Sequence, residues 1–169
     1  MTVNPNSSDG VVILTPFAPH DAASLREVDE DHEHRRRFGV PDDFVPSLQH
    51  SERVIAGWER DRAEGTRYAF AVRDARTADL LGGCEIRPGE DGSGAVSYWT
   101  LPRWRRRGFA TRAVLLACEV AFGDLGLERL EILTAEDNSP SRRVAMGAGF
   151  EEVGRRDGRI VHVLEAGRA

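Results

Sequence analysis

Three successive segments between residues 95 and 135 constrain the fold of this chain more than any other feature. AVSYWTL (95–101) alternates like a strand, ATRAVLLACEVAFGDLG (110–126) has the apolar spacing of an amphipathic helix, and LERLEILTA (127–135) is again strand-like. Strand, helix and strand in direct succession are typical of a βαβ crossover, which joins parallel strands. The sequence therefore predicts an α/β protein.

The segments around this crossover complete one α/β (α+β) mixed-sheet domain. Before it, the patterns predict a strand at 11–15, helices at 19–31 and 47–65 separated by a loop or broken helix at 32–46, and strands at 67–74 and 78–88. After it, they predict a short helix at 139–149 and a hairpin at 150–164 that turns at Asp157-Gly158. The predicted order is β-α-α-β-β-β-α-β-α-β-β.

Residues 1–10 have neither the apolar nor the basic region of a secretory signal, and we expect them to be a disordered lead-in. Residues 11–169 are long enough to form a single domain with its own core. No run approaches the roughly 20 apolar residues that span a bilayer, so no membrane partner is expected.

Composition argues against several functional classes. The net charge of −5 disfavours nucleic acid as a partner. Cys84 and Cys118 lie far apart in apolar stretches, which favours reduced, buried thiols in a cytoplasmic protein over a metal or redox motif. All 23 basic residues are arginine, which excludes a Schiff-base lysine and the lysine of a P-loop.

The loop RRRG (105–108) joins the predicted strand to the predicted helix. The first amide groups of a helix lack internal partners, and the helix dipole adds positive potential there. Gly108 allows an anion to approach the backbone closely, and the small Ala110 and Thr111 leave space beside it. These residues suit a phosphate-binding turn. On their own they also fit an exposed, charged helix start or a weak nucleic-acid patch, although no aromatic platforms accompany the arginines.

Two segments resemble one known family. YWTLPRWRRRGFAT (98–111) resembles the acyl-CoA-binding segment of the GNAT superfamily of N-acetyltransferases, whose Gln/Arg-x-x-Gly-x-Gly/Ala signature is matched by Arg105, Gly108 and Ala110. EDNSPSRRVAMGAGF (136–150) resembles a second family segment through Asn138, Ser141 and the Gly-Phe at its end. The predicted element order also matches that family over residues 11–164, which is nearly the whole chain.

Within the superfamily the chain looks most like the RimJ/RimL type, which commonly has the pair seen here at Tyr98 and Trp99, followed by a proline and tryptophan, here Pro102 and Trp104. The resemblance implies the GNAT acyl-CoA N-acyltransferase fold, acetyl-CoA as cosubstrate and no metal. It implies acetyl transfer to a primary amine by direct attack in a ternary complex.

The resemblance also implies roles for individual residues. The backbone of Trp99 and Thr100, with Asn138, would bind the pantetheine arm. The backbone amides that would hold the pyrophosphate are those of Arg106, Arg107, Gly108, Phe109, Ala110 and Thr111.

The catalytic residues follow the family less closely. Many members have a tyrosine acid where this chain has Ala145, so the candidate acid is Ser141; the alternative is that Ser141 only caps its helix. Glu85, in the strand LLGGCEIRP, is the candidate base because it could project into the acceptor cleft. One alternative is that Glu85 is a solvent-facing strand residue; another is that a water molecule mediates removal of the proton.

The segment DHEHRRR (31–37) has a His-x-His pair, His32 and His34, but no further ligand set, so no metal is expected. The acidic residues between 29 and 33 would favour a cationic amine in the acceptor cleft, or would form a solvated helix face. The expected acceptor is a protein N-terminus or a small-molecule amine, and the expected state is a cytoplasmic monomer or homodimer. The alternative function is a non-catalytic GNAT-fold module that binds CoA as a sensor or scaffold.

Overall fold

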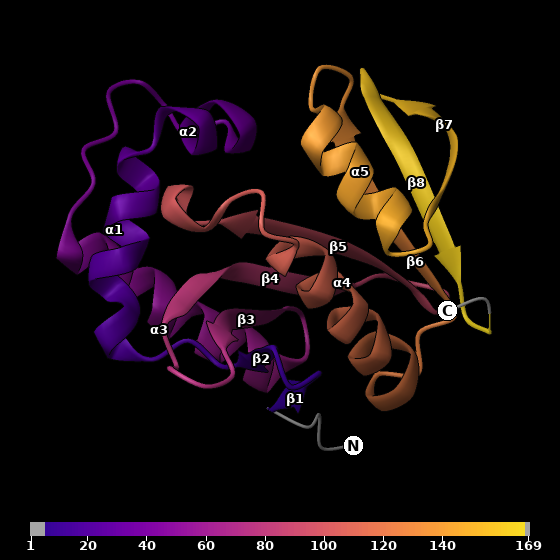
Figure 1. Cartoon of the computed structure of the whole chain (residues 1–169), viewed down its shortest axis with the longest axis horizontal. Coiled ribbons are helices and arrows are strands. Elements are labelled where there is room, and N and C mark those ends of the chain that lie inside the picture. Colours follow the sequence, from indigo (N-terminus) through magenta and orange to yellow (C-terminus); the bar gives the residue numbers. More distant parts are fainter. Residues whose placement is uncertain (1–5, 168–169) are drawn as a thin grey trace.

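An eight-stranded mixed sheet organises residues 6–167, which are the residues that the computed structural model describes (Figure 1). The strand order is β1-β2-β3-β4-β5-β6-β8-β7, and every neighbouring pair is antiparallel except β5 and β6. The strands are β1 (Ser7–Ser8), β2 (Val12–Thr15), β3 (Tyr68–Asp74), β4 (Leu80–Pro88), β5 (Ser93–Thr100), β6 (Arg129–Ala135), β7 (Glu151–Arg156) and β8 (Arg159–Glu165).

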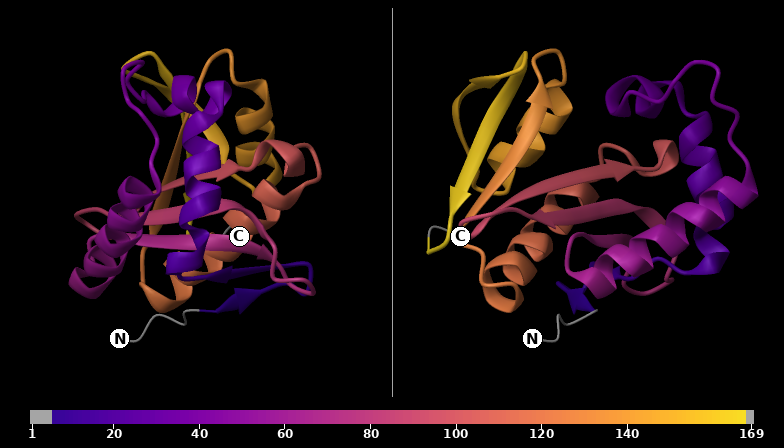
Figure 2. Two further views of the ribbon diagram at one scale, coloured as in Figure 1. Left: turned by 90° about the vertical axis from the view of Figure 1, so that its left-hand side faces the viewer. Right: turned by 180° about the vertical axis from the view of Figure 1, so that it is seen from behind.

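Helices cover both faces of this sheet (Figure 2), with α4 and α5 on one face and α1 and α3 on the other. The α-helices are α1 (Ala22–Glu30), α2 (His32–Phe38), α3 (Leu48–Glu64), α4 (Phe109–Glu119) and α5 (Ser139–Gly147). Short 3-10 turns, η1 (Pro19–Asp21) and η2 (Pro102–Trp104), precede α1 and α4, and the wider π-turn η3 (Val120–Asp124) extends α4. No helix within residues 6–167 is both long and apolar enough to cross a membrane.

The predicted mixed sheet and its parallel crossover through α4 are confirmed. The predicted hairpin turn is also present, because Asp157 and Gly158 have φ angles of 50° and 71°, the positive values that a type I′ turn requires.

Two local expectations need correction. The segment 32–46 contains a true helix, α2, because Asp31 caps it by accepting a hydrogen bond from the His34 amide at 2.9 Å. The disordered lead-in is wrong for the part that the structure describes. There Ser7 and Ser8 pair with β2 as strand β1, and the Ser8 hydroxyl donates to the Val12 carbonyl at 3.0 Å. Residues 1–5 lie outside the described residues.

The strands of the parallel pair β5–β6 diverge along their length (Figure 1), and the interval between their diverging halves is called the cleft below. Ser93–Ala95 pair with Arg129–Glu131, and the two strands then diverge. By contrast, β5 stays paired with β4 without a register shift from Gly94 to Thr100. The second half of β5 therefore has β4 on one edge and an open edge towards the cleft.

A buried ion pair fixes the start of α1 to the sheet. The carboxylate of Asp21, only 3% exposed, accepts hydrogen bonds from the Arg73 guanidinium at 3.0 and 2.6 Å. Arg73 also donates to the Thr15 hydroxyl at 3.0 Å, so β2, β3 and η1 meet at one guanidinium. Such bidentate geometry is the arrangement in which a buried ion pair is best satisfied.

Candidate active site

The loop between η2 and α4 presents a row of free backbone amides. Gly108, the residue before α4, has φ 80° and ψ 0°, and Arg106 has φ 60°. No side chain caps α4, and within residues 6–167 the amides of residues 106–111 donate no hydrogen bond. Orphan amides at a helix N-terminus form an anion-binding site, as the sequence predicts.

The arginine side chains of this loop point to different partners. Arg105 forms an ion pair with Asp31 and donates to the Thr100 carbonyl at 3.3 Å, so it ties the loop to the α1–α2 junction. Arg107 lies over the Trp104 ring, 5.0 Å from its centroid, while Arg106 is exposed. Of the three arginines, Arg105 is therefore the one whose side chain fixes the position of the loop.

A narrow crevice between β4, β5 and the start of α4 brings together four of the predicted cofactor residues. They are Trp99, Thr100, Phe109 and Ala110. A side chain at Gly83 would overlap the Trp99 indole, so this close approach of β4 to β5 depends on glycine. Phe109 and Ala110, which line the crevice, also belong to the row of free amides at the start of α4.

At the other wall of the cleft, Asn138 and Ser141 take different roles at the start of α5. The Asn138 side-chain oxygen accepts from the Ser141 amide at 3.2 Å, so Asn138 caps the helix. Ser141 is not the cap. Its hydroxyl lies 2.8 Å from the Tyr98 hydroxyl, and Tyr98 also donates to the Ser141 carbonyl at 2.9 Å.

Tyr98 is a site residue that sequence reasoning missed. The sequence shows it only as half of a Tyr-Trp pair, and nothing in that pair indicates contact with a helix 43 residues away. Burial raises the pKa of Tyr98 to about 12, so its phenol stays protonated near neutral pH. A protonated hydroxyl therefore stands behind Ser141, although the chain has Ala145 at the position of the common family tyrosine.

On the opposite face of β5 lies a cavity of about 300 Å³. Its walls come from α1, α2 and α3 on one side and from β3, β4 and β5 on the other, with Arg159 from β8 at its margin. Aromatic rings form much of the lining: Phe17, His34, Phe38, Trp58 and Trp99. Among the described residues, Trp99 alone lines both this cavity and the crevice.

Glu85 projects into this cavity, as expected for the candidate base, but its carboxylate is already engaged. Arg67 forms a two-pronged ion pair with one oxygen. Arg87 lies 2.8 Å from the other oxygen, which also accepts from the Ser97 hydroxyl at 2.9 Å. Taking up a proton would weaken these ion pairs, so Glu85 is free to act on an amine only after a guanidinium moves away.

The acidic residues expected to attract a cationic amine are mostly occupied elsewhere. Glu30 pairs with Arg26 at 3.0 Å and Glu33 with Arg37 at 2.9 Å. Burial opposes ionisation of Asp31, but hydrogen bonds from Arg105 and from the His34 amide outweigh it and lower its pKa. Of this group only Asp29 lines the cavity, and burial raises its pKa.

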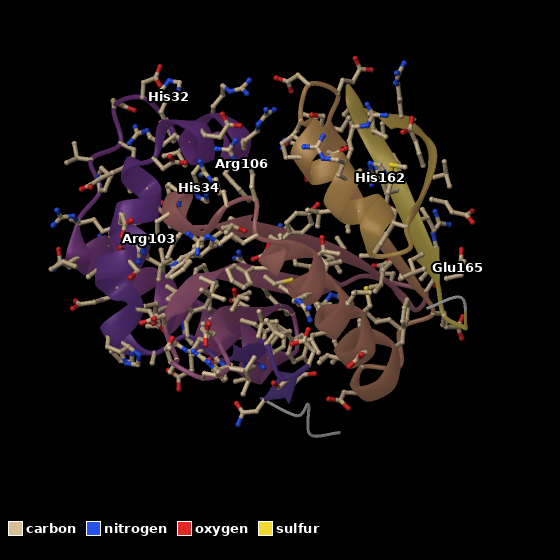
Figure 3. All side chains as sticks on the ribbon, viewed as in Figure 1. His32, His34, Arg103, Arg106, His162 and Glu165 are labelled. Carbon is tan, nitrogen blue, oxygen red and sulfur yellow. The ribbon has the colours of Figure 1, made fainter. Side chains whose placement is uncertain are left out.

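His34 lines the cavity, whereas His32 is exposed. Figure 3 shows His34 on the α1–α2 side of the cleft and His162 on the opposite side, with α5 and β8. The His34 ring stacks on Phe38 at 4.4 Å and meets Trp99 edge-on at 5.9 Å. Burial lowers the pKa of His34 to about 4, so the ring is neutral at pH 7. Within residues 6–167, no group of three or more His, Cys, Asp or Glu side chains is placed to hold a metal ion.

Two ion pairs bridge the cleft above these sites. Arg36 and Arg37 of α2 lie 3.0 and 2.6 Å from the carboxylate of Asp137, in the loop before α5. Asp137 is adjacent to Asn138, so α2 is linked to the wall of the cleft that holds Ser141.

Comparison with known proteins identifies the family. A family model described as the acetyltransferase (GNAT) domain matches residues 12–151. The chain belongs to the GNAT acetyltransferase family. The match covers both segments on which the resemblance in the sequence rests and most of the sheet.

Individual GNAT relatives agree with this assignment. The chain is 24% identical over 147 residues to the uncharacterized N-acetyltransferase YoaA of Bacillus subtilis (strain 168), covering 85% of this chain and 81% of YoaA. It resembles the structure of a putative ribosomal-protein-serine acetyltransferase from Vibrio cholerae with a TM-score of 0.79 and 23% identity, covering 98% and 99% of the two chains. Mycobacterium smegmatis RimJ, solved in complex with CoA-disulfide, gives a TM-score of 0.80 at 21% identity, covering 97% and 87%.

The GNAT fold expected from the sequence is thus confirmed. With its family and its N-acetyltransferase relatives, the chain is an acetyl-CoA-dependent acetyltransferase.

Proposed function

We propose that this GNAT protein transfers the acetyl group of acetyl-CoA to a primary amine by direct attack in a ternary complex. The observation that carries the proposal is the position of Trp99, which lines both the crevice and the larger cavity. A thioester in the crevice and an amine in the cavity would meet across this residue. Holding two reactants together in this way is itself a large part of catalysis.

The residues on the crevice side fit a CoA thioester. The free amides of residues 106–111 would hold the pyrophosphate, and the open edge of β5 at Trp99 and Thr100 would hydrogen-bond the pantetheine arm. The side-chain oxygen of Asn138 caps α5 by accepting a hydrogen bond, so its NH₂ group can donate to pantetheine. When bound, acetyl-CoA supplies the activated acetyl group.

Ser141 is placed to protonate the departing sulfur. When its hydroxyl proton turns from Tyr98 towards a ligand in the cleft, the single O–H of the Tyr98 phenol can turn from the Ser141 carbonyl to the Ser141 hydroxyl oxygen. In this arrangement Ser141 is the catalytic acid and Tyr98 is a positioning residue that supplies the second hydrogen bond.

The attacking amine must lose a proton, and Glu85 is the proposed acceptor of that proton, directly or through water. Its place in the cavity supports this role, and its ion pairs with Arg67 and Arg87 set the condition that a guanidinium must first be drawn away. The proposed acceptor is a protein N-terminus or a small-molecule amine; among the relatives, the Vibrio cholerae protein is described as a ribosomal-protein-serine acetyltransferase.

An amine and peptide panel with thiol detection tests this function. We expect thiol release that depends on both acetyl-CoA and an amine, and an increase of melting temperature with CoA. Ser141→Ala should lower kcat by about 10- to 100-fold with little change in the KM for acetyl-CoA, and Glu85→Gln should lower kcat most at low pH.

Ser139→Ala is the matched control, because Ser139 begins the same helix and its hydroxyl contacts only Arg143, at 3.4 Å. Tyr98→Phe should lower kcat by less than Ser141→Ala. Thermal stabilisation by CoA without thiol release from any amine would contradict the proposal and support a non-catalytic CoA-binding module.

A further inference from the structure

We infer that the acceptor carries a negatively charged group, a carboxylate or a phosphate, which is bound by the guanidinium groups of Arg67, Arg87 and Arg159. The inference rests on the proposed acetyl transfer and names the chemistry of its second substrate. It starts from the charges that face the cavity.

Three guanidinium groups and a single contacting carboxylate, Glu85, form the sheet side of the cavity. This cluster therefore has an excess of positive charge. The backbone of Arg159 pairs within the sheet, but its side chain forms no hydrogen bond or ion pair with another residue of the described part of the chain, although it lines the cavity. The one further carboxylate in the lining, Asp29, lies on α1, so the lining has three guanidinium groups and two carboxylates.

Strand register places Arg67 and Arg87 side by side, and Arg159 reaches the same cavity from β8. Tyr68 pairs with Ile86, so Arg67 lies next to Arg87 across the β3–β4 ladder. On the other flank, Arg87 pairs with Ala95, whose short side chain leaves space beside the guanidinium. Guanidinium groups bind carboxylate and phosphate oxygens through two parallel hydrogen bonds, which suits this open position.

The strand register also gives the expected distance between the amine and the negatively charged group of the acceptor. Trp99, where the amine meets the thioester, lies two residues along β5 from Ser97 and four from Ala95. At about 3.3 Å per residue, these intervals are roughly 7 and 13 Å. The acceptor therefore has its amine and its negative charge separated by several bonds, as in an ω-amino acid or in a peptide with an acidic side chain near its N-terminus.

An anion of this kind would also release the base. A carboxylate that binds Arg87 competes with Glu85 for the guanidinium that now lies 2.8 Å from the Glu85 carboxylate. The proton acceptor would thus become available only when the anionic acceptor is bound.

Matched pairs of acceptors test the inference. We would measure kcat/KM for 6-aminohexanoate against 6-aminohexanamide, for 6-aminohexyl phosphate against 6-aminohexanol, and for Ser-Glu against Ser-Gln peptides with amidated C-termini. The anionic member of at least one pair should be preferred by tenfold or more, and added salt should reduce that preference. The three pairs separate carboxylate, phosphate and peptide sources of the charge.

Variants locate the effect. Arg87→Gln and Arg159→Gln should each reduce the preference for the anionic acceptor, which is the ratio of its kcat/KM to that of the neutral partner, by roughly fivefold. Arg53→Gln is the control. Arg53 is exposed on α3 outside the cavity, and its substitution changes the net charge by the same amount.

Equal rates for the members of all three pairs would overturn the inference and leave the proposed acetyl transfer standing, because thiol release would still occur. Binding gives a readout that needs no turnover: N-acetyl-6-aminohexanoate should stabilise the CoA-saturated wild type thermally, and Arg87→Gln should abolish that shift. Absence of a shift in the wild type would count against the anion site even if no amine were acetylated.

Discussion

The two sides of the proposed active site are built from different parts of the polypeptide. The proposed cofactor side uses backbone: the amides of residues 106–111, the open edge of β5, and glycines that admit close approach. The acceptor side uses side chains from seven elements, held by ion pairs such as Arg67–Glu85 and Asp21–Arg73. A backbone site tolerates most substitutions but not a change of local conformation, whereas a side-chain site depends on each partner.

The largest expected effect tests how the acceptor side is held together. Asp21→Asn keeps the shape of the side chain but leaves the Arg73 guanidinium buried without its counter-charge. We expect the free energy of unfolding to fall by about 3–5 kcal/mol, measured by urea denaturation. Glu30→Gln, which breaks an exposed pair with Arg26, should leave the denaturation midpoint almost unchanged. Similar effects from both changes would mean that the buried pair does not anchor α1.

A second prediction tests the cofactor side through its backbone. Gly108→Val forces a β-branched residue to φ 80° and places methyl groups where the pyrophosphate would lie. The KM for acetyl-CoA should rise by roughly 100-fold, as measured by thiol release. Gly10→Val is the matched control: Gly10 has φ 85° and open space around it, but lies between β1 and β2, so the strain is similar and the KM should not change.

The third prediction concerns the pH dependence of stability on the acceptor side. Burial lowers the pKa of His34 to about 4. Between about pH 6.5 and pH 4, His34 therefore binds a proton in the unfolded chain but not in the folded protein. This histidine should therefore reduce stability as the pH falls from about 6.5 to 4, by a total on the order of 1–3 kcal/mol, with no further loss below pH 4.

His34→Gln should remove that component, seen as a smaller loss of unfolding free energy between pH 7 and pH 5 than in the wild type. The pKa of His162 is also lowered by its burial, but its contribution is present in both proteins and cancels in the difference. Parallel curves for the two proteins would show that His34 is not desolvated in solution.

The smallest expected effect concerns a side chain of the loop before α4 rather than its backbone. Arg106→Ala removes an exposed side chain but keeps the amide that the anion site uses. The KM for acetyl-CoA should change by no more than about threefold, since one exposed charge contributes little. A loss comparable to that of Gly108→Val would show that the loop binds its ligand through side chains, and the contrast between the two sides would fail.

This difference also explains what could be predicted from the sequence. The cofactor side follows from a local pattern, since a strand, a glycine and an amphipathic helix in succession place free amides at one point. Asn138 and Ser141 were found because they recur at a fixed distance from that loop in a known family. The crossover and the sheet follow from period changes that are equally local.

The features that were missed depend on contacts between distant segments. Tyr98 touches Ser141 only because β5 and α5 converge on the cleft, and the partners of Glu85 come from β3, β4 and β5 at once. The acidic residues between 29 and 33 were expected to face the acceptor, but arginines from α1, α2 and the cofactor loop neutralise most of them. Helix α2 depends on one capping aspartate, and β1 on its pairing with β2, which weak local propensity does not reveal.

The cationic lining of the acceptor cavity has a chemical consequence for the protein's own integrity. No lysine is present in this sequence, and each of its 23 arginines has a guanidinium, which remains protonated near neutral pH and does not attack a thioester. An acetyltransferase with lysines around its cavity would present competing nucleophiles to its own donor. Here no side chain is a primary amine, so intact-mass spectrometry after prolonged incubation with acetyl-CoA should show no acetyl adduct on a side-chain amine.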